Sequence, residues 1–212
     1  MNQESLLKLI ADTGYNAGFG AKKHFASYDM IEKLPGLIGL LSISVGVLAL
    51  IKPDLSTNDI SAVVLILGVI GLYISQHSSD KDQLSKAGVE LTDIFDQLKI
   101  LYHRVKIKTN DDFSEELQQF EKLQKAYSAQ SMPSQLVLSD WYAHYKFFWQ
   151  HQIEWLDEQK KFSFWRDKIP LSFTLTCLFM LGIFLYNAIP LSELCVSALN
   201  ILGSGEISTP KL

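Results

Sequence analysis

Two apolar stretches separated by eight residues decide the fold of this chain. Residues 34–51 read LPGLIGLLSISVGVLALI and residues 60–79 read ISAVVLILGVIGLYISQHSS, with KPDLSTND between them. Neither stretch contains an Asp, Glu, Lys or Arg. Because a hydrocarbon core of about 30 Å needs about 20 apolar residues in a helix, each stretch meets or nearly meets the length of a membrane span. The short loop leaves room only for an antiparallel helical hairpin, and Pro53 cannot continue the first helix.

A third apolar window covers residues 169–192. All 42 charged side chains, 19 basic and 23 acidic, lie outside the three windows. The chain therefore combines apolar segments with a charged remainder of ordinary soluble composition. This distribution predicts a membrane protein with three transmembrane helices.

Charge and motifs exclude several classes of function. A net charge of −4 argues against nucleic-acid binding, which depends on neutralising phosphates, so we expect no sequence-specific nucleic-acid partner. The sequence has no His-Glu-x-x-His, Gly-x-x-x-x-Gly-Lys, Cys-x-x-Cys or Gly-x-Ser-x-Gly motif. We therefore expect no enzyme, no catalytic residues, no cofactor and no metal site.

Basic residues near the ends of the spans predict the orientation, because Lys and Arg in short loops stay on the cytoplasmic side. They precede the first span and crowd the entrance to the third, whereas the hairpin loop holds one. We expect five segments: a cytoplasmic N-terminal helix (1–33), a transmembrane hairpin (34–75), a cytoplasmic helical region (76–168), a third transmembrane helix (169–190) and an extracytoplasmic tail (191–212).

Small residues recur on one face of each hairpin helix. In lipid, small residues let helices approach closely, and close contact holds helix pairs together. This face serves either as the packing surface of the hairpin itself or as a surface that meets a neighbouring subunit or a lumen. The candidate packing or gate residues are Gly39, Ser42, Gly46, Ser61, Gly68, Gly71 and Ser75.

The remaining segments show helical periodicity and no alternating strand pattern, so the fold class is all-α: an N-terminal amphipathic helix, the hairpin, a cytoplasmic helical bundle or coiled-coil region, and the third span. Residues 84–105 keep a/d spacing over three heptads and predict a seam facing another helix, which we assign to the cytoplasmic bundle or to an oligomer contact. Further helices are expected over 113–127 and 138–156. The seam residues are Leu84, Leu91, Ile94, Leu98 and Leu101.

All four tryptophans fall between residues 141 and 165, beside several basic residues. Trp and Tyr gather at membrane interfaces, and Lys and Arg anchor the inner leaflet, so core packing with interface anchoring is one interpretation. The other is a pocket for an anionic, stackable ligand such as a nucleotide. The candidate cluster comprises Trp141, Tyr145, Trp149, Lys161, Trp165 and Arg166.

The order of these segments resembles the SLATT domain, the SMODS and SLOG-associating two-transmembrane effector. The resemblance lies in the helix LLKLIADTGY (6–15), its continuation through AKKH (21–24) into the hairpin, and the following helix from KAGVE (86–90) to LYHRV (101–105). It implies a bacterial defence effector that a neighbouring sensor, often a nucleotide-messenger synthase, switches on. Such effectors permeabilise the inner membrane, so that the infected cell dies before phage is released. The resemblance carries over no catalytic residue.

Together these observations suggest a homo-oligomer in the lipid bilayer of the bacterial inner membrane. In this hypothesis the cytoplasmic heptad helix holds the subunits, and the hairpins line or gate a path between them. The alternative function is a membrane-anchored scaffold or adaptor, whose cytoplasmic helices recruit a soluble partner while its spans only anchor it.

Overall fold

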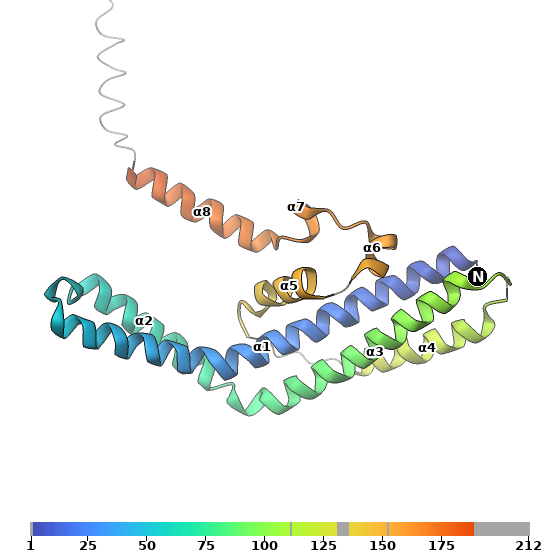
Figure 1. Ribbon diagram of the computed structural model, residues 1–212, viewed down its shortest axis with the longest axis horizontal. Coiled ribbons are helices and arrows are strands. Elements are labelled where there is room, and N and C mark those ends of the chain that lie inside the picture. The colour runs from blue at the N-terminus through green and yellow to red at the C-terminus, as the bar shows by residue number, and fades with distance from the viewer. Residues whose placement is uncertain (1, 111, 131–135, 152, 189–212) are drawn as a thin grey trace, which may run out of the picture. The chain divides into compact units, whose positions relative to one another are not determined.

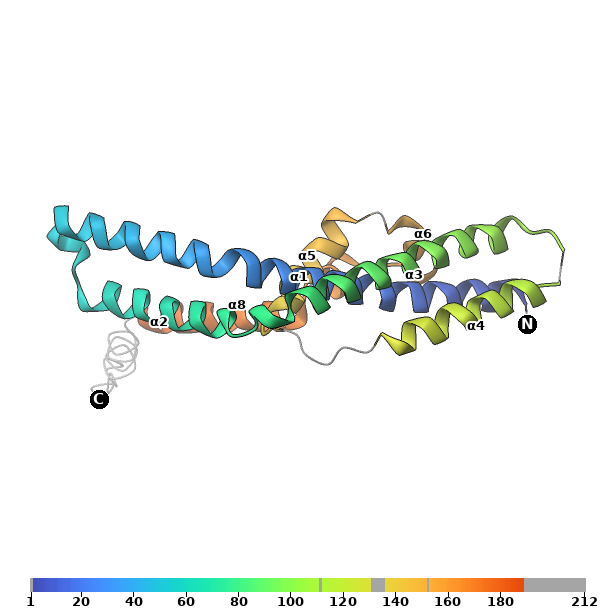
Figure 2. The same cartoon turned by 90° about the horizontal axis from the view of Figure 1, so that it is seen from below.

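The structure is a computed structural model that describes residues 2–110, 112–130, 136–151 and 153–188. It divides into two units, residues 1–168 and residues 169–212. Every regular element within the described residues is helical, which confirms the all-α class. Figures 1 and 2 show the elements from two directions.

The longest element is α1 (Gln3–Ile51), one uninterrupted helix of 49 residues. It begins where the Asn2 side chain accepts a hydrogen bond from the Ser5 backbone N–H (2.9 Å), and it ends where Lys52 turns extended ahead of Pro53. Pro35 lies inside the helix and does not end it. The predicted cytoplasmic helix and the first predicted span are therefore one rod, with no break between residues 33 and 34.

The hairpin continues through a short 3₁₀ turn, η1 (Pro53–Leu55), into α2 (Asn58–Ser75). The Thr57 hydroxyl accepts a hydrogen bond from the Ile60 N–H (3.3 Å) and caps α2. A second 3₁₀ turn, η2 (Ser78–Asp80), then leads into α3 (Lys81–Ile107). The antiparallel hairpin expected from the eight-residue loop is thus present (Figure 1).

The main helical core forms where α3 and α4 (Ser114–Ala129) pack along the N-terminal half of α1. Asp112 Oδ1 accepts hydrogen bonds from the N–H and hydroxyl of Ser114 at the start of α4. The helix expected over 113–127 is therefore present, and it is buried at Phe113, Phe120 and Leu123.

The segment after residue 136 differs from the single helix expected over 138–156. It forms α5 (Ser139–Gln150), α6 (Glu154–Lys160) and α7 (Phe164–Asp167), and His151 is already extended. The buried residues of α5 are Ser139, Ala143, Phe147 and Phe148, whereas Trp141 is half-buried and Tyr145 is exposed. The apolar spacing continues across the break, which is why periodicity alone did not reveal it. Both α5 and α6 lie along α1 on the side away from α4 (Figures 1 and 2).

The second unit is described as far as Ala188 and contains α8 (Leu171–Ala188), an apolar helix of 18 residues. The predicted tail, residues 191–212, lies outside the described residues.

Candidate functional site in the membrane hairpin and the helices that hold it

The two hairpin helices leave a cleft near the η1 end. Its volume is about 350 Å³, and Ser42, Gly46 and Ser61 of the predicted gate residues line it. Apolar side chains complete the wall: Val45, Ala49, Leu55, Ile60, Val64 and Leu65, together with Ser56. The cleft is bounded by only two helices, so one chain does not enclose a conduit.

The glycines of the hairpin do not hold its two helices together. A Cβ added at Gly39, Gly46 or Gly68 would have no other side chain within 4 Å. Only Gly71 meets the partner helix, where its Cβ would contact Ile38 at 3.6 Å. Of the two interpretations of the small-residue stripe, packing within the hairpin is thus not what Gly39, Gly46 and Gly68 serve in the described residues.

Two serines of the hairpin donate their hydroxyl hydrogen bonds within their own helices. The Ser75 hydroxyl donates to the Gly71 carbonyl (2.9 Å), and the Ser44 hydroxyl donates to the Leu40 carbonyl (2.8 Å). Such internal hydrogen bonds remove the cost of an unpaired hydroxyl in lipid. The outer surface is otherwise aliphatic and exposed, with Leu40, Ile43 and Leu65 among its side chains.

The predicted seam on α3 is buried against α1 of the same chain. Leu98 and Leu101 are fully buried in the main core, next to Ile10 and Ala17 of α1. Leu84 packs with Ile31 and Ile74 in a second cluster beside the hairpin. This corrects the assignment of Leu84, Leu91, Ile94, Leu98 and Leu101 to an oligomer contact, because all five are covered within one chain. A heptad pattern marks a buried face but does not say which helix covers it.

Three glycines outside the hairpin form close contacts between helices. The indole of Trp155 packs against Gly14 of α1, and a Cβ at Gly18 would lie 2.7 Å from the ring of Phe95 on α3. On α3, a Cβ at Gly88 would lie 2.9 Å from Phe25. Small residues at heptad spacing in α1 were the available signal, but they do not identify which rings enter.

Ion pairs join α1 to its neighbours just before the first span. Asp29 accepts hydrogen bonds from Lys33 (2.8 Å) and from Lys146 of α5. Burial alone would raise the pKa of the Asp29 carboxyl, but hydrogen bonds and charges from Lys146 and Lys33 together hold that pKa below its usual value. Glu32 pairs with Lys81 at the start of α3. The turns of α1 that precede the first span are thus tied to both α3 and α5.

A model of the family described as SMODS and SLOG-associating 2TM effector domain 6 matches residues 1–177, which is most of the chain. The chain belongs to this family. No curated protein and no solved structure matches it.

Membership makes the protein a two-transmembrane effector of anti-phage defence. Within the described residues, two helical stretches are long and apolar enough to cross a membrane, α1 and the run Asn58–Ile107 that contains α2. These are the two arms of the hairpin and agree with the description of the family. The apolar helix Leu171–Leu185 is shorter, and the family match ends inside it.

Three histidines of this effector lie where α5 meets α1 and α3. His24 is buried in α1, with no hydrogen-bond partner for its Nδ1 among the described residues. His144 packs edge-on against Phe19 (5.0 Å between ring centroids), and His151 lies against Phe95 (4.9 Å). Burial lowers the pKa of all three, that of His151 to about 4, so these imidazoles are neutral at pH 7.

The predicted aromatic and basic cluster does not converge on one cavity. Tyr145 and Trp149 are exposed on the outer side of α5, and Lys161 and Arg166 are exposed as well. Trp141 is half-buried, and the side chain of Trp165 lies outside what the structure describes. A polar cavity of about 280 Å³ nearby contains only Arg166 of this set; its other lining residues are Lys8, Asp12, Tyr15, Gln159, Lys160, Phe162 and Asp167. Across the described part of the chain, no three His, Cys, Asp or Glu side chains group as metal ligands would.

Proposed function

We propose that this effector forms a homo-oligomer in the bacterial inner membrane and permeabilises that membrane when a defence signal reaches it. Depolarisation then stops growth or kills the infected cell, which is abortive infection. In this proposal the N-terminus and residues 76–168 face the cytoplasm, the C-terminus lies outside, and the protein acts without catalysis.

The observation that carries the proposal is the continuity of α1. The same helix forms the centre of the cytoplasmic core, from Leu6 to Ile31, and the first arm of the hairpin. A helix transmits rotation and tilt along its length, since its hydrogen bonds and close packing resist bending. A partner that shifts α3 or α5 against α1 would therefore move the hairpin with it.

The hairpin supports the requirement for several copies. An added Cβ at positions 39, 46 and 68 would meet no atom within 4 Å. The cleft beside Ser42 and Ser61 is open on one side, where the hairpin does not close it. Small residues that do not serve intrachain packing are available for close contact with another helix. We assign this contact to the hairpin of a second subunit.

A trigger can act by changing the population of two arrangements of the cytoplasmic helices. The ion pairs of Asp29 and Glu32 tie α1 to α5 and α3 at the membrane side of the core. A neighbouring defence sensor or nucleotide-messenger synthase is the class of partner that this proposal expects. Its effect would be to favour the arrangement in which hairpins of different subunits form the open path.

The test measures membrane potential and dye entry in cells that express the full chain, with and without infection. Gly39→Leu and Gly68→Leu should abolish depolarisation without reducing the amount of protein in the membrane, because neither side chain meets another group within the chain. Leu40→Phe is the matched control, since it adds volume at an exposed position of the same helix and should leave depolarisation unchanged. Unaltered ion leakage in both glycine variants would contradict the proposal.

The same assay separates this proposal from a scaffold. Replacing residues 34–75 by an unrelated two-helix anchor should abolish depolarisation and protection if the hairpin forms the path. A chain that still protects cells after this exchange would act through its cytoplasmic helices alone.

A further inference from the structure

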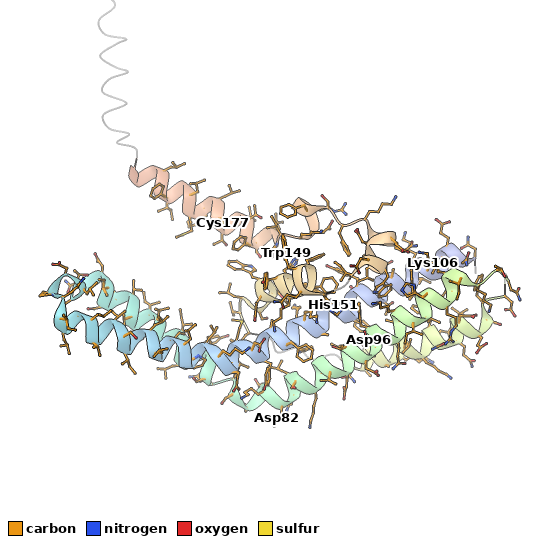
Figure 3. All side chains as sticks on the ribbon, viewed as in Figure 1. Asp82, Asp96, Lys106, Trp149, His151 and Cys177 are labelled. Carbon is orange, nitrogen blue, oxygen red and sulfur yellow. The ribbon has the colours of Figure 1, made fainter. Side chains whose placement is uncertain are left out.

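The outer side of α5–α7 carries an exposed aromatic surface that the core does not use. Tyr145 is 51 %, Trp149 60 % and Phe164 45 % exposed. The rings of Trp149 and Phe164 meet edge to face at 6.1 Å, so α5 and α7 present one continuous patch. Figure 3 shows Trp149 on the opposite side of α5 from His151, which faces the core. We call Tyr145, Trp149, Phe164, Lys161 and Arg166 the aromatic-basic face.

The charge around this face is opposite in sign to that of the whole chain. Residues 159–168 hold four basic side chains and one acidic one, which gives +3, whereas the full chain carries −4. Lys161 and Arg166 are exposed within this segment; Arg166 also pairs with Asp167, as Lys160 does with Asp12. Exposed aromatic rings with an apolar body and a polar edge, next to cations, match the headgroup region of an anionic bilayer.

The covalent chain supplies an independent reason to place this face near lipid. If α8 spans the membrane, Leu171 lies at the bilayer boundary, and only nine residue steps separate it from Phe162. Phe164–Asp167 is helical, so four of these steps rise about 1.5 Å each and the other five extend at most about 3.3 Å each. The distance from Phe162 to Leu171 is therefore at most about 22 Å.

The position of Tyr15 on α1 gives a second distance between Phe162 and the bilayer. Phe162 packs on Tyr15 of α1, with ring centroids 5.7 Å apart. Tyr15 precedes Leu34, the start of the first span, by 19 residues, or about 28 Å of helix. If α8 spans the membrane, the connection therefore keeps α6 and α7 within reach of the bilayer surface.

We propose that the aromatic-basic face lies on the cytoplasmic surface of the bilayer and that its partner is the headgroup layer of anionic phospholipid. The rings of Tyr145, Trp149 and Phe164 enter the interface, and Lys161 and Arg166 meet the phosphates. The cytoplasmic core then lies against the membrane by its α5 side and leaves α4, on the other side of α1, to the cytoplasm.

The experiment places an environment-sensitive fluorophore on either side of the cytoplasmic core in the full chain. In a Cys177→Ser, Cys195→Ser background, Trp149→Cys carries the dye on the aromatic-basic face, and Ile100→Cys carries it on α3. The two positions are equally exposed, at 60 % and 59 %, so neither substitution disturbs the core. The protein is reconstituted in vesicles of phosphatidylethanolamine and phosphatidylglycerol that contain lipid spin-labelled at acyl carbon 5.

The spin label should quench the dye at position 149 at least twofold more than the dye at position 100, and iodide in water should do the opposite. Equal quenching at both positions would overturn the proposal. A dye at 149 that neither quencher reaches would also overturn it, because another protein surface would then cover the face. Lys161→Gln with Arg166→Gln should reduce lipid quenching at 149; an unchanged value would remove the ionic part of the proposal. Since the readout is depth and not ion flux, it is independent of the proposed permeabilisation.

Discussion

Substitution of Gly14 tests the packing of the main helical core around α1. A Cβ at this position would lie closer to Cη2 of Trp155 than any real Cβ contact, and 3.1 Å from Cζ2. The indole cannot simply move away, because Trp155 is buried between Phe95 (5.4 Å between ring centroids) and Tyr102 (5.2 Å). Gly14→Ala should therefore destabilise the folded protein.

The magnitude follows from two opposing effects. Adding one methyl to a closed core costs about 1–3 kcal/mol, sometimes more. Replacing glycine by alanine inside a helix returns about 1 kcal/mol. The net loss for Gly14→Ala is up to about 2 kcal/mol, which lowers the melting temperature by up to roughly 8 °C in a chain of this size.

Gly20 provides the control on the same helix. Its Cβ would meet only Leu91 Cδ1, at 3.4 Å, so Gly20→Ala keeps the helix gain without the overlap and should raise the melting temperature by a few degrees. Thermal unfolding of the full chain in detergent, followed by circular dichroism, measures both variants.

A double substitution tests the cause of the loss. Trp155→Phe removes the ring atoms that Gly14→Ala would strike, so the double variant should lose less stability than the sum of the two single losses, by about 1 kcal/mol. Strict additivity, or a rise in melting temperature for Gly14→Ala alone, would refute the contact as the reason for the glycine.

Three further outcomes follow from buried ionisable groups. Burial holds the pKa of His151 at about 4 in the folded chain, against 6.5 in the unfolded chain, so the unfolded state binds more protons between these pH values. The stability of the fold should therefore fall as the pH drops from about 6.5 to 4, and it should fall less in His151→Asn. Melting temperature measured against pH checks this. Lys108 holds the buried carboxylate of Glu116 with two contacts (2.8 and 2.9 Å), so Lys108→Met should cost about 1–3 kcal/mol and Glu116→Gln less, measured by denaturant unfolding. Asp29→Asn removes the acceptor shared with Lys146 and should speed amide exchange in α5 more than in α4, whereas equal exchange in both helices would contradict this role for the pair.

The hairpin could be predicted from the sequence because it depends on one strong signal. The apolar residues of 34–51 and 60–75 and the Pro53 loop allow few other structures in a membrane. The heptad pattern of α3 likewise identified the buried face, from Leu84 to Leu101, without any knowledge of its partner. Both predictions rest on local composition and spacing.

Other features depend on which surfaces meet, and spacing does not encode that. The partner of the α3 seam is α1 and not another chain, and the indole that fills the space at Gly14 comes from a residue 141 positions away. The helix expected over 138–156 breaks at His151 although its apolar spacing persists. For the same reason the sequence left open whether the glycines of the membrane stripe pack within the hairpin or meet a neighbouring subunit, and three of them have no neighbour in the described residues.

The two groups of glycines therefore have different physical roles. Gly14, Gly18 and Gly88 are filled by aromatic rings of the same chain, so a larger residue there acts on folding. At Gly39, Gly46 and Gly68 an added Cβ meets no atom within 4 Å in the described part of the chain, so we expect the effect of a substitution there to arise from lipid or from another subunit. Since α1 contains members of both groups on one unbroken helix, substitutions along it can separate the stability of the core from the assembly of the hairpin. A loss of toxicity without a change in melting temperature at the second group would assign that surface to contacts between subunits.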